Sequence, residues 1–232
     1  MNQATLFPRQ KQEIAPGAIH IPSWLSTEEQ RELLALCREW AKPPAGLYTP
    51  QMLNGQPMSV RVVCLGWHWY PYRYSKTRDD GDGLPCKPFP LELDRLAQLA
   101  LPATLSEYQA QFQPDVAIVN WYSAQAKLGM HQDRNESETV RQAGSPIISI
   151  SLGDSCLFRF GNTQSRSGRH QDLKLASGDL FVFGAASRMA FHAVTKIYPV
   201  TAPPELGMRQ GRLSITIRQT GLIPDGIRNP SA

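Results

Sequence analysis

From residue 113 onward, apolar and polar positions alternate with a period of two in one short segment after another. The segments are DVAIVNWYSA, SPIISISLGD, SCLFRFGN, DLKLASGDLFVFG, AFHAVTKI and RLSITIRQT, and Gly, Asp, Asn or Ser separates them. This alternation is typical of β-strands, and no segment of helical periodicity interrupts the series. Many short strands at such spacing predict a closed or sandwiched antiparallel architecture, and we expect a jelly-roll barrel over residues 113–221.

Upstream of the strands, the period changes to that of amphipathic helices. The segment HIPSWLSTEEQRELLALCREWA contains a capping box, Ser26 with Glu29, followed by apolar residues at i, i+3, i+4 and i+7. A second helix is predicted over PLELDRLAQLALPAT. We therefore expect an N-terminal extension with a packing helix in residues 1–45, a second packing helix in residues 91–112, and a mainly β fold with flanking helices (α+β).

Residues 46–90, between these helices, have a different composition. They are rich in Gly and Pro, and Arg and Lys alternate with a group of aromatic residues. Five aromatic side chains fall within eight residues: Trp67, Trp69, Tyr70, Tyr72 and Tyr74. Hairpins and loops are expected here, and the aromatic residues form either a binding surface or a small core of their own. Residues 222–232 are expected to form a C-terminal tail.

Composition places few further limits on function. The chain has 232 residues, of which 41% are hydrophobic, and a net charge of +4, which is compatible with a polyanionic partner. Its four cysteines form no C-x-x-C pair, which excludes common zinc-finger spacings and favours a reducing compartment. We find no signal-peptide pattern and no apolar run of roughly 18 residues. We therefore expect a cytoplasmic monomer with no membrane association.

Candidate metal ligands stand in KLGMHQDRNES, where His131 and Asp133 are two residues apart. On a strand, such residues share one face. His192, in SRMAFHAVTK, is expected inside a barrel strand and would complete a set of two histidines and one carboxylate. That set leaves three coordination positions open and is typical of non-haem Fe(II). Alone, however, H-x-D is also the pattern of a polar turn, and a single buried histidine is more often a core residue.

The strand GRLSITIRQTG carries polar and apolar residues on opposite faces. Its polar face contains Arg212, Ser214, Thr216 and Arg218. If this face is solvated, the arginines need no special partner. If it faces the barrel interior, the two guanidinium groups require an anion, and paired hydrogen bonds suit arginine to a dicarboxylate. Asn120 and Tyr122, two apart in IVNWYS, add an amide and a phenol that suit a small polar anion.

With these residues together, the chain resembles the AlkB family of Fe(II)/2-oxoglutarate dioxygenases, which demethylate alkylated nucleic acid. The order N-x-Y, H-x-D, a distal His and R-x-S-x-T-x-R carries the resemblance, which is strongest over residues 113–221. It implies a double-stranded β-helix (jelly-roll) core with an N-terminal nucleotide-recognition lid in residues 46–90. It also implies that His131, Asp133 and His192 bind iron.

The resemblance further assigns the co-substrate residues. Asn120 and Tyr122 match residues that hydrogen-bond 2-oxoglutarate. Arg212 matches the arginine that pairs with the distal carboxylate, and Arg218 matches the one near the metal-binding end. Ser214 stands where an asparagine is usual, so it keeps a hydrogen-bonding group with a shorter reach.

For the nucleic acid, the resemblance implies a second set of residues. Trp67 and Tyr72, with Tyr74, match lid residues that grip the flipped base and its flanking phosphate, and Arg166 matches a substrate-contacting arginine. Asn135 replaces an aspartate that faces the exocyclic amino group of the target base. Since an amide carries no charge and donates as well as accepts, this replacement bears on base preference.

The implied reaction is oxidative demethylation of bases such as 1-methyladenine and 3-methylcytosine, that is, direct-reversal DNA repair. It consumes O2, converts 2-oxoglutarate to succinate and CO2, and releases formaldehyde. The implied partner is alkylated DNA, single- or double-stranded, with RNA as a second candidate. Two alternatives remain open on the residues alone: a hydroxylase of the same fold acting on a protein or small molecule, and a non-catalytic nucleic-acid-binding module.

Overall fold

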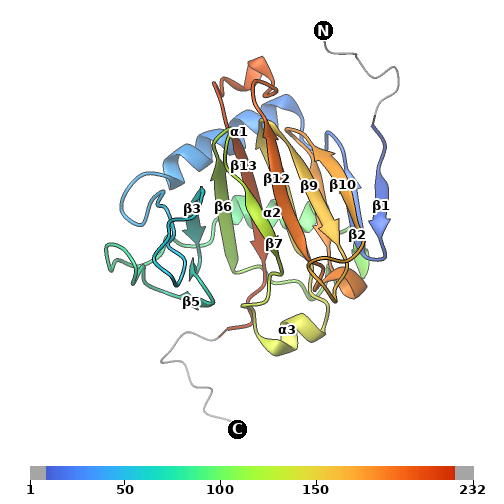
Figure 1. The fold of residues 1–232 in the computed structure, drawn as a ribbon, viewed down its shortest axis with the longest axis horizontal. Coiled ribbons are helices and arrows are strands. Elements are labelled where there is room, and N and C mark those ends of the chain that lie inside the picture. The colour runs from blue at the N-terminus through green and yellow to red at the C-terminus, as the bar shows by residue number, and fades with distance from the viewer. Residues whose placement is uncertain (1–8, 223–232) are drawn as a thin grey trace.

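A computed structural model describes residues 9–222, in which two antiparallel sheets face each other (Figure 1). The larger sheet has the order β1 (Gln12–Ala15), β2 (Ala18–Ile21), β11 (Leu180–Phe183), β8 (Ile147–Gly153), β13 (Arg212–Arg218), β6 (Val116–Tyr122), β3 (Val60–Leu65). The smaller sheet has the order β10 (His170–Leu175), β9 (Ser155–Gly161), β12 (His192–Tyr198), β7 (Leu128–His131). This two-sheet arrangement confirms the predicted jelly-roll core.

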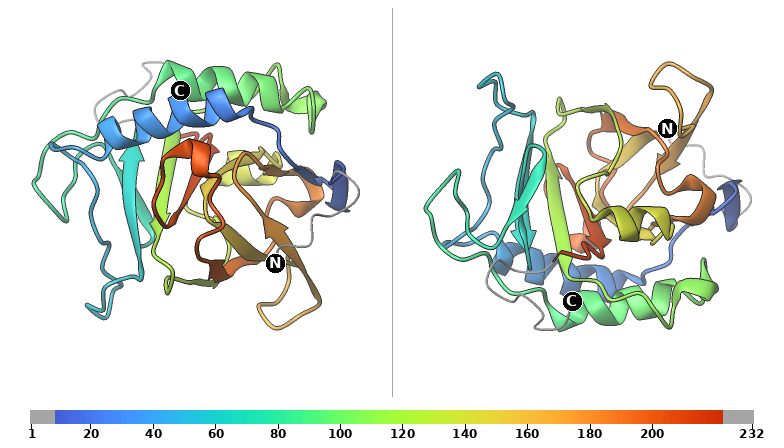
Figure 2. Two further views of the ribbon diagram at one scale, coloured as in Figure 1. Left: turned by 90° about the horizontal axis from the view of Figure 1, so that it is seen from above. Right: turned by 90° about the horizontal axis from the view of Figure 1, so that it is seen from below.

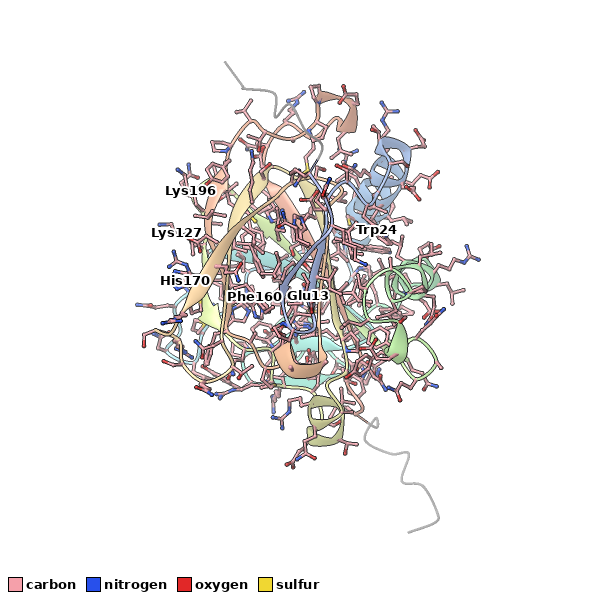
Figure 3. All side chains as sticks on the ribbon, turned by 90° about the vertical axis from the view of Figure 1, so that its right-hand side faces the viewer. Glu13, Trp24, Lys127, Phe160, His170 and Lys196 are labelled. Carbon is pink, nitrogen blue, oxygen red and sulfur yellow. The ribbon has the colours of Figure 1, made fainter. Side chains whose placement is uncertain are left out.

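Strand alternation separates two hydrophobic clusters, one on each face of the larger sheet. Between the sheets, Phe158 and Phe160 of β9 meet Phe181 of β11, with ring centroids 5.1 and 5.2 Å from that of Phe181. On the smaller sheet, the polar residues His170 and Lys196 are exposed, whereas Phe160 is buried (Figure 3). The period-two pattern of the sequence therefore separates residues that point between the two sheets from residues that point to solvent.

Two helices cover the other face of the larger sheet, where they lie side by side (Figure 2). α1 (Thr27–Trp40) begins at the predicted capping box, in which the Glu29 amide donates to Ser26 Oγ at 3.3 Å. α2 is Leu91–Ala100. Their apolar faces pack on the outward residues of the sheet, so both faces of the central strands are buried.

All six predicted strand segments are present, and DLKLASGDLFVFG forms two strands, β10 and β11. The strands β1 and β2 in the N-terminal extension and β3 in the expected lid were not predicted, because they are short or irregular in pattern. β3 pairs with β6 in the larger sheet, so part of residues 46–90 belongs to the core. The remainder of that segment includes the hairpin of β4 (His68–Tyr70) and β5 (Arg73–Ser75).

Other features complete the fold. A short helix, α3 (Glu138–Gln142), follows the H-x-D segment. Within residues 9–222, no helix has both the length and the apolar character needed to cross a bilayer. The expected C-terminal tail lies outside the described residues, apart from Leu222.

We expect Ile215→Ala to lower the free energy of unfolding by about 2–5 kcal/mol. Ile215 is fully buried, because it lies on the face of β13 that packs against the helices. Chemical denaturation measures the change. The control is Leu99→Ala, at a residue that is 63% exposed, for which we expect a change below about 0.5 kcal/mol. Equal effects of the two substitutions would contradict the packing described.

Candidate active site

The three predicted metal ligands meet because of one strand register. β12 pairs with β7 so that His192 lies directly opposite His131, and their ring centroids are 4.4 Å apart. Asp133 follows two residues after the end of β7, in the loop rather than on the strand as expected. One ligand atom from each of the three residues lies within 4.8 Å of the others. Residues 61 positions apart in the chain thus form one cluster.

The two imidazole rings are oriented by backbone carbonyls. His131 Nδ1 lies 2.8 Å from the Gly129 oxygen, and His192 Nδ1 lies 3.0 Å from the Ala190 oxygen. A carbonyl only accepts, so each Nδ1 carries the hydrogen and each Nε2 presents a lone pair toward Asp133. Burial, together with the nearby His131, lowers the pKa of His192 to about 4. His192 is therefore neutral at physiological pH, as metal binding requires.

Asp133 supplies the anionic ligand. Its Oδ2 lies 2.8 Å from Arg218 Nη2 and 3.6 Å from His192 Nε2. Burial raises the pKa of this carboxyl, but the neighbouring groups, Arg218 first among them, together outweigh that effect and hold the pKa below its usual range. Asp133 is thus ionised, and the cluster has the donor set that non-haem Fe(II) prefers.

The co-substrate residues lie on β6 and β13, which pair with Tyr122 opposite Arg212 and Asn120 opposite Ser214. Every residue of β13 is buried. The polar face of β13 is therefore not solvated: it points between the sheets, while Ile215 and its apolar neighbours pack under the helices. This excludes one of the two interpretations left open by the strand pattern.

Arg212 has the chemistry of an anion site. It is 1% exposed, and its Nη2 donates to Ser151 Oγ at 2.8 Å. Its Nε and Nη1 are buried without a hydrogen-bond partner in residues 9–222, and no carboxylate of those residues forms an ion pair with it. Such a guanidinium is costly unless a ligand supplies the anion. A dicarboxylate such as 2-oxoglutarate fits this requirement.

A single cavity of about 580 Å³ connects these groups. It is lined by all eight predicted metal and co-substrate residues: Asn120, Tyr122, His131, Asp133, His192, Arg212, Ser214 and Arg218. From the side of the β4–β5 hairpin and nearby loops it is lined by Trp69, Tyr72, Asn135 and Arg166. The cavity therefore joins the metal cluster to the expected substrate side, and its size suits a small dicarboxylate with a base.

Two expected lid residues lie elsewhere. Trp67 is 5% exposed, donates from Nε1 to Asp115 Oδ2 at 3.1 Å and packs in the core. Tyr74 donates to Glu136 Oε1 at 2.9 Å. Neither lines the cavity, whereas Trp69, which was not assigned a role from the sequence, does. Strand alternation could not separate the two tryptophans, because residues two apart share one face; they differ because Trp67 precedes β4, whereas Trp69 lies on it.

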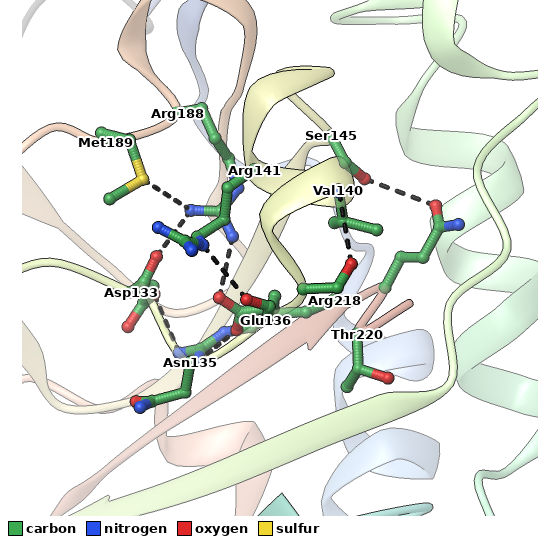
Figure 4. A network of polar contacts seen from close by, with 12 residues as sticks. Asp133, Asn135, Glu136, Val140, Arg141, Ser145, Arg188, Met189, Arg218 and Thr220 are labelled. Atoms are coloured by element: carbon green, nitrogen blue, oxygen red, sulfur yellow. Dashed lines mark hydrogen bonds and ion pairs between the residues drawn. The ribbon is translucent and has the colours of Figure 1, made fainter. Parts of the chain in front are cut away.

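A buried ion network supports the metal cluster (Figure 4). Glu136 Oε2 lies 2.9 Å from Arg188 Nη2, and Glu136 Oε1 lies 3.2 Å from Arg218 Nη1. Arg188 Nη1 also donates to the Asp133 backbone oxygen at 2.7 Å. The network fixes the loop that carries Asp133. Glu136 and Arg188 were missed from the sequence, although a buried arginine face signals that a carboxylate must lie nearby.

Comparison with known proteins agrees with this geometry. The profile of the 2OG-Fe(II) oxygenase superfamily matches residues 17–218. An alpha-ketoglutarate-dependent dioxygenase AlkB homolog from Caulobacter vibrioides is 33% identical over 213 residues, which cover 89% of each chain. The chain belongs to the AlkB family. Its co-substrate and metal are 2-oxoglutarate and Fe(II), with O2 as the second co-substrate.

Two further proteins are similar to this chain over most of its length. The DNA N(6)-methyladenine demethylase ALKBH1C of Arabidopsis thaliana is 34% identical over 224 residues, which cover 89% of this chain and 49% of the relative. The chain thus spans about half the length of this AlkB relative. The solved structure of OsALKBH1 superimposes with a TM-score of 0.80 at 32% identity, covering 90% of this chain and all of that one. The fold and family predicted from the motifs are confirmed.

We expect Arg212→Met to weaken 2-oxoglutarate binding at least about tenfold, because charge-assisted hydrogen bonds contribute roughly 1.5–3 kcal/mol. Titration of the Fe(II)-loaded protein without O2 measures the affinity. Since the substitution also removes a buried charge without a partner, the melting temperature of the ligand-free protein should not fall. Arg209→Met, at an exposed residue, is the control. Unchanged affinity in Arg212→Met would refute the assignment.

Glu136→Gln should destabilise the protein by about 3–5 kcal/mol, because it removes the buried carboxylate that pairs with Arg188 and one of the two that pair with Arg218. Thermal and chemical unfolding measure the loss. Glu138→Gln, two residues further along and exposed, should change stability little. A stable Glu136→Gln protein would mean that the network is not a structural support.

Proposed function

We propose that this chain catalyses the oxidative demethylation of N-methylated bases in nucleic acid, with DNA as the main substrate and RNA as a second one. The observation that carries the proposal is the cavity in which the triad and the Arg212 site lie beneath exposed aromatic and basic side chains. A small-molecule site would not need such a rim. The name of the Arabidopsis relative supports a methylated base as substrate.

Different residues of the chain would bind the metal and the co-substrate. His131, Asp133 and His192 would hold Fe(II) and leave three positions for ligands. Arg212 would bind the distal carboxylate of 2-oxoglutarate, and Arg218 with Asn120 and Tyr122 the remaining polar atoms. When bound, the metal, 2-oxoglutarate and O2 together convert an N-methyl group to N-hydroxymethyl, with succinate and CO2 as co-products, and the hydroxymethyl group leaves as formaldehyde. The walls of the cavity position the methyl group and exclude water.

The β4–β5 hairpin supplies aromatic surface at the cavity. Tyr72 is 56% exposed, and its φ of 77° lies in the left-handed region that favours glycine. Holding a tyrosine there costs of order 1–3 kcal/mol, so its presence points to a role in binding. A flipped base could stack on Trp69 or Tyr72, and such stacking is worth roughly 1–3 kcal/mol.

Three exposed basic residues, Lys127, Arg134 and Arg166, also line the cavity. Lys127 directly precedes β7, Arg134 directly follows Asp133, and Arg166 lies in the loop between β9 and β10. Positive side chains of this kind contact phosphates and position a strand without reading its sequence. They support nucleic acid over a protein or a small molecule as the substrate.

The proposal predicts that the protein with Fe(II) and 2-oxoglutarate releases formaldehyde from oligonucleotides that contain 1-methyladenine or 3-methylcytosine. Mass spectrometry of the oligonucleotide and a formaldehyde assay measure equal amounts of repaired base and product. Asp133→Ala should lower the rate by more than about 100-fold, because it removes an anionic metal ligand. Glu107→Ala, at an exposed residue, is the control.

Two results would overturn the proposal. Succinate release without demethylation of any methylated DNA or RNA oligonucleotide would favour a protein or small-molecule hydroxylase. Binding of oligonucleotides with no turnover of 2-oxoglutarate would favour a non-catalytic binding module.

A further inference from the structure

The outer face of the smaller sheet carries a row of positive charge. Phe158 of β9 points between the two sheets, so its neighbour Leu157 points outward. In the strand register, Leu157 lies between Lys174 of β10 and Lys196 of β12. Both lysines are exposed, and their Nζ atoms lie 5.8 and 5.0 Å from the ring centroid of Tyr198. Two ammonium groups therefore converge on one part of this face.

Carboxylates do not balance these cations. The four strands of the smaller sheet, together with Lys127 and the loop of residues 162–169, contain six Lys or Arg residues and one carboxylate, Asp172. Arg159 pairs with Asp172 at 2.8 Å, and within residues 9–222 the other five cations form no ion pair. The helices α1 and α2, on the opposite side of the molecule (Figure 2), contain six carboxylates and three basic residues. The sheet side is therefore positive and the helical side negative.

The positive face is continuous with the cavity. The edge strand of the smaller sheet, β7, lines the cavity, and so do Lys127, which directly precedes β7, and Arg166, in the loop before β10. At Gly129 of β7 a Cβ atom would meet nothing within 4 Å, so this edge is open to the close approach of a ligand backbone. Figure 3 shows Lys196, Lys127 and His170 on the same side of the molecule. A polyanion bound at the cavity can therefore extend over β7 onto this face.

The length and chemistry of this face suit the phosphates of a double helix. From His170 to Lys174, β10 extends about 13 Å, which is the rise of about four base pairs. Lysine side chains contact phosphates without reading the bases. A single strand is bound instead by exposed aromatic rings on which its bases stack. Tyr198 of this face is half-buried beside the two lysines, so it is not such a stacking surface.

We propose that the outer face of the smaller sheet binds the phosphate backbone of a double-helical segment that adjoins the flipped nucleotide. The inference rests on the proposed function, since the flipped base occupies the cavity while the helix lies beyond β7. Lys174 and Lys196 contact phosphates and take no part in the chemistry. The face therefore favours substrates in which a methylated base lies next to a base-paired stem over short isolated strands.

Two double variants separate contact with the stem from a general effect of charge. Combining Lys174→Gln with Lys196→Gln removes two positive charges from the proposed face, and both positions are exposed, so the melting temperature should not change. The matched control combines Arg38→Gln with Arg95→Gln, which removes the same charge from exposed positions on α1 and α2. If only the net charge of the chain mattered, both double variants would have the same effect.

The experiment compares a short single strand that contains 3-methylcytosine with the same strand extending from a stem of about ten base pairs, one helical turn. Fluorescence anisotropy measures Kd over a range of salt concentrations, with the full chain, Fe(II) and 2-oxoglutarate but without O2. For the stem oligonucleotide, we expect the lysine double variant to raise Kd about tenfold or more and to lower the slope of log Kd against log salt by about two. Its Kd for the short strand, and both Kd values of the control, should stay within about twofold of wild type.

Other results would overturn the inference. An unchanged Kd and salt slope for the stem oligonucleotide would mean that the lysines do not contact it, and equal losses for both oligonucleotides would assign them to the single strand. Binding to phosphatidylserine vesicles that requires the two lysines, with no effect on the stem oligonucleotide, would assign this face to a membrane surface. The proposed function is tested separately, with O2: succinate release without repair of either oligonucleotide would refute it, whereas anisotropy would still report on the face.

Discussion

Charge balance between the two sheets is the constraint around which this site is built. Arg188, Arg212 and Arg218 are all buried, and within residues 9–222 the buried carboxylates that lie among them are Asp133 and Glu136. The carboxylates pair with Arg188 and Arg218, which leaves Arg212 without an anionic partner in the described residues. Fe(II) and the 2-oxoglutarate dianion together add no net charge, yet they supply a cation for Asp133 and carboxylates for the arginines. The site is thus electrostatically matched to the pair and not to either one alone.

The same network connects substrate recognition to the metal. Tyr74 of the β4–β5 hairpin donates to Glu136 and accepts from Arg218 Nη1 at 3.1 Å, and burial raises the pKa of its hydroxyl, which keeps it a donor. Trp69 of the same hairpin donates to Asn135. Residues 131–136 therefore carry two of the three metal ligands, Glu136 of the ion network and Asn135 of the cavity wall within six residues. A displacement of the hairpin would disturb all three.

Much of the fold and of the candidate site was predicted from the sequence, and there are physical reasons why the other features were missed. Period-two alternation predicted the strands because one face of each is buried, and the order of motifs predicted the cofactor residues. The pattern of β13 alone could not place Arg212 in the interior or in solvent, because its polar face is buried only when the smaller sheet lies over it. Trp67 was chosen over Trp69 because period-two alternation places residues two apart on one face, and only the structure shows that β4 begins after Trp67. Glu136 was missed because burial of a carboxylate depends on partners distant in the chain.

The uncharged amide of Asn135 also affects the charge balance of the buried ion network. An aspartate there would place a third carboxylate within four residues of the chain, next to Asp133 and Glu136, and like charges in a buried site disfavour ionisation. The amide avoids that repulsion and keeps the network neutral apart from Arg212. It also gives up the attraction that a carboxylate offers to a cationic base.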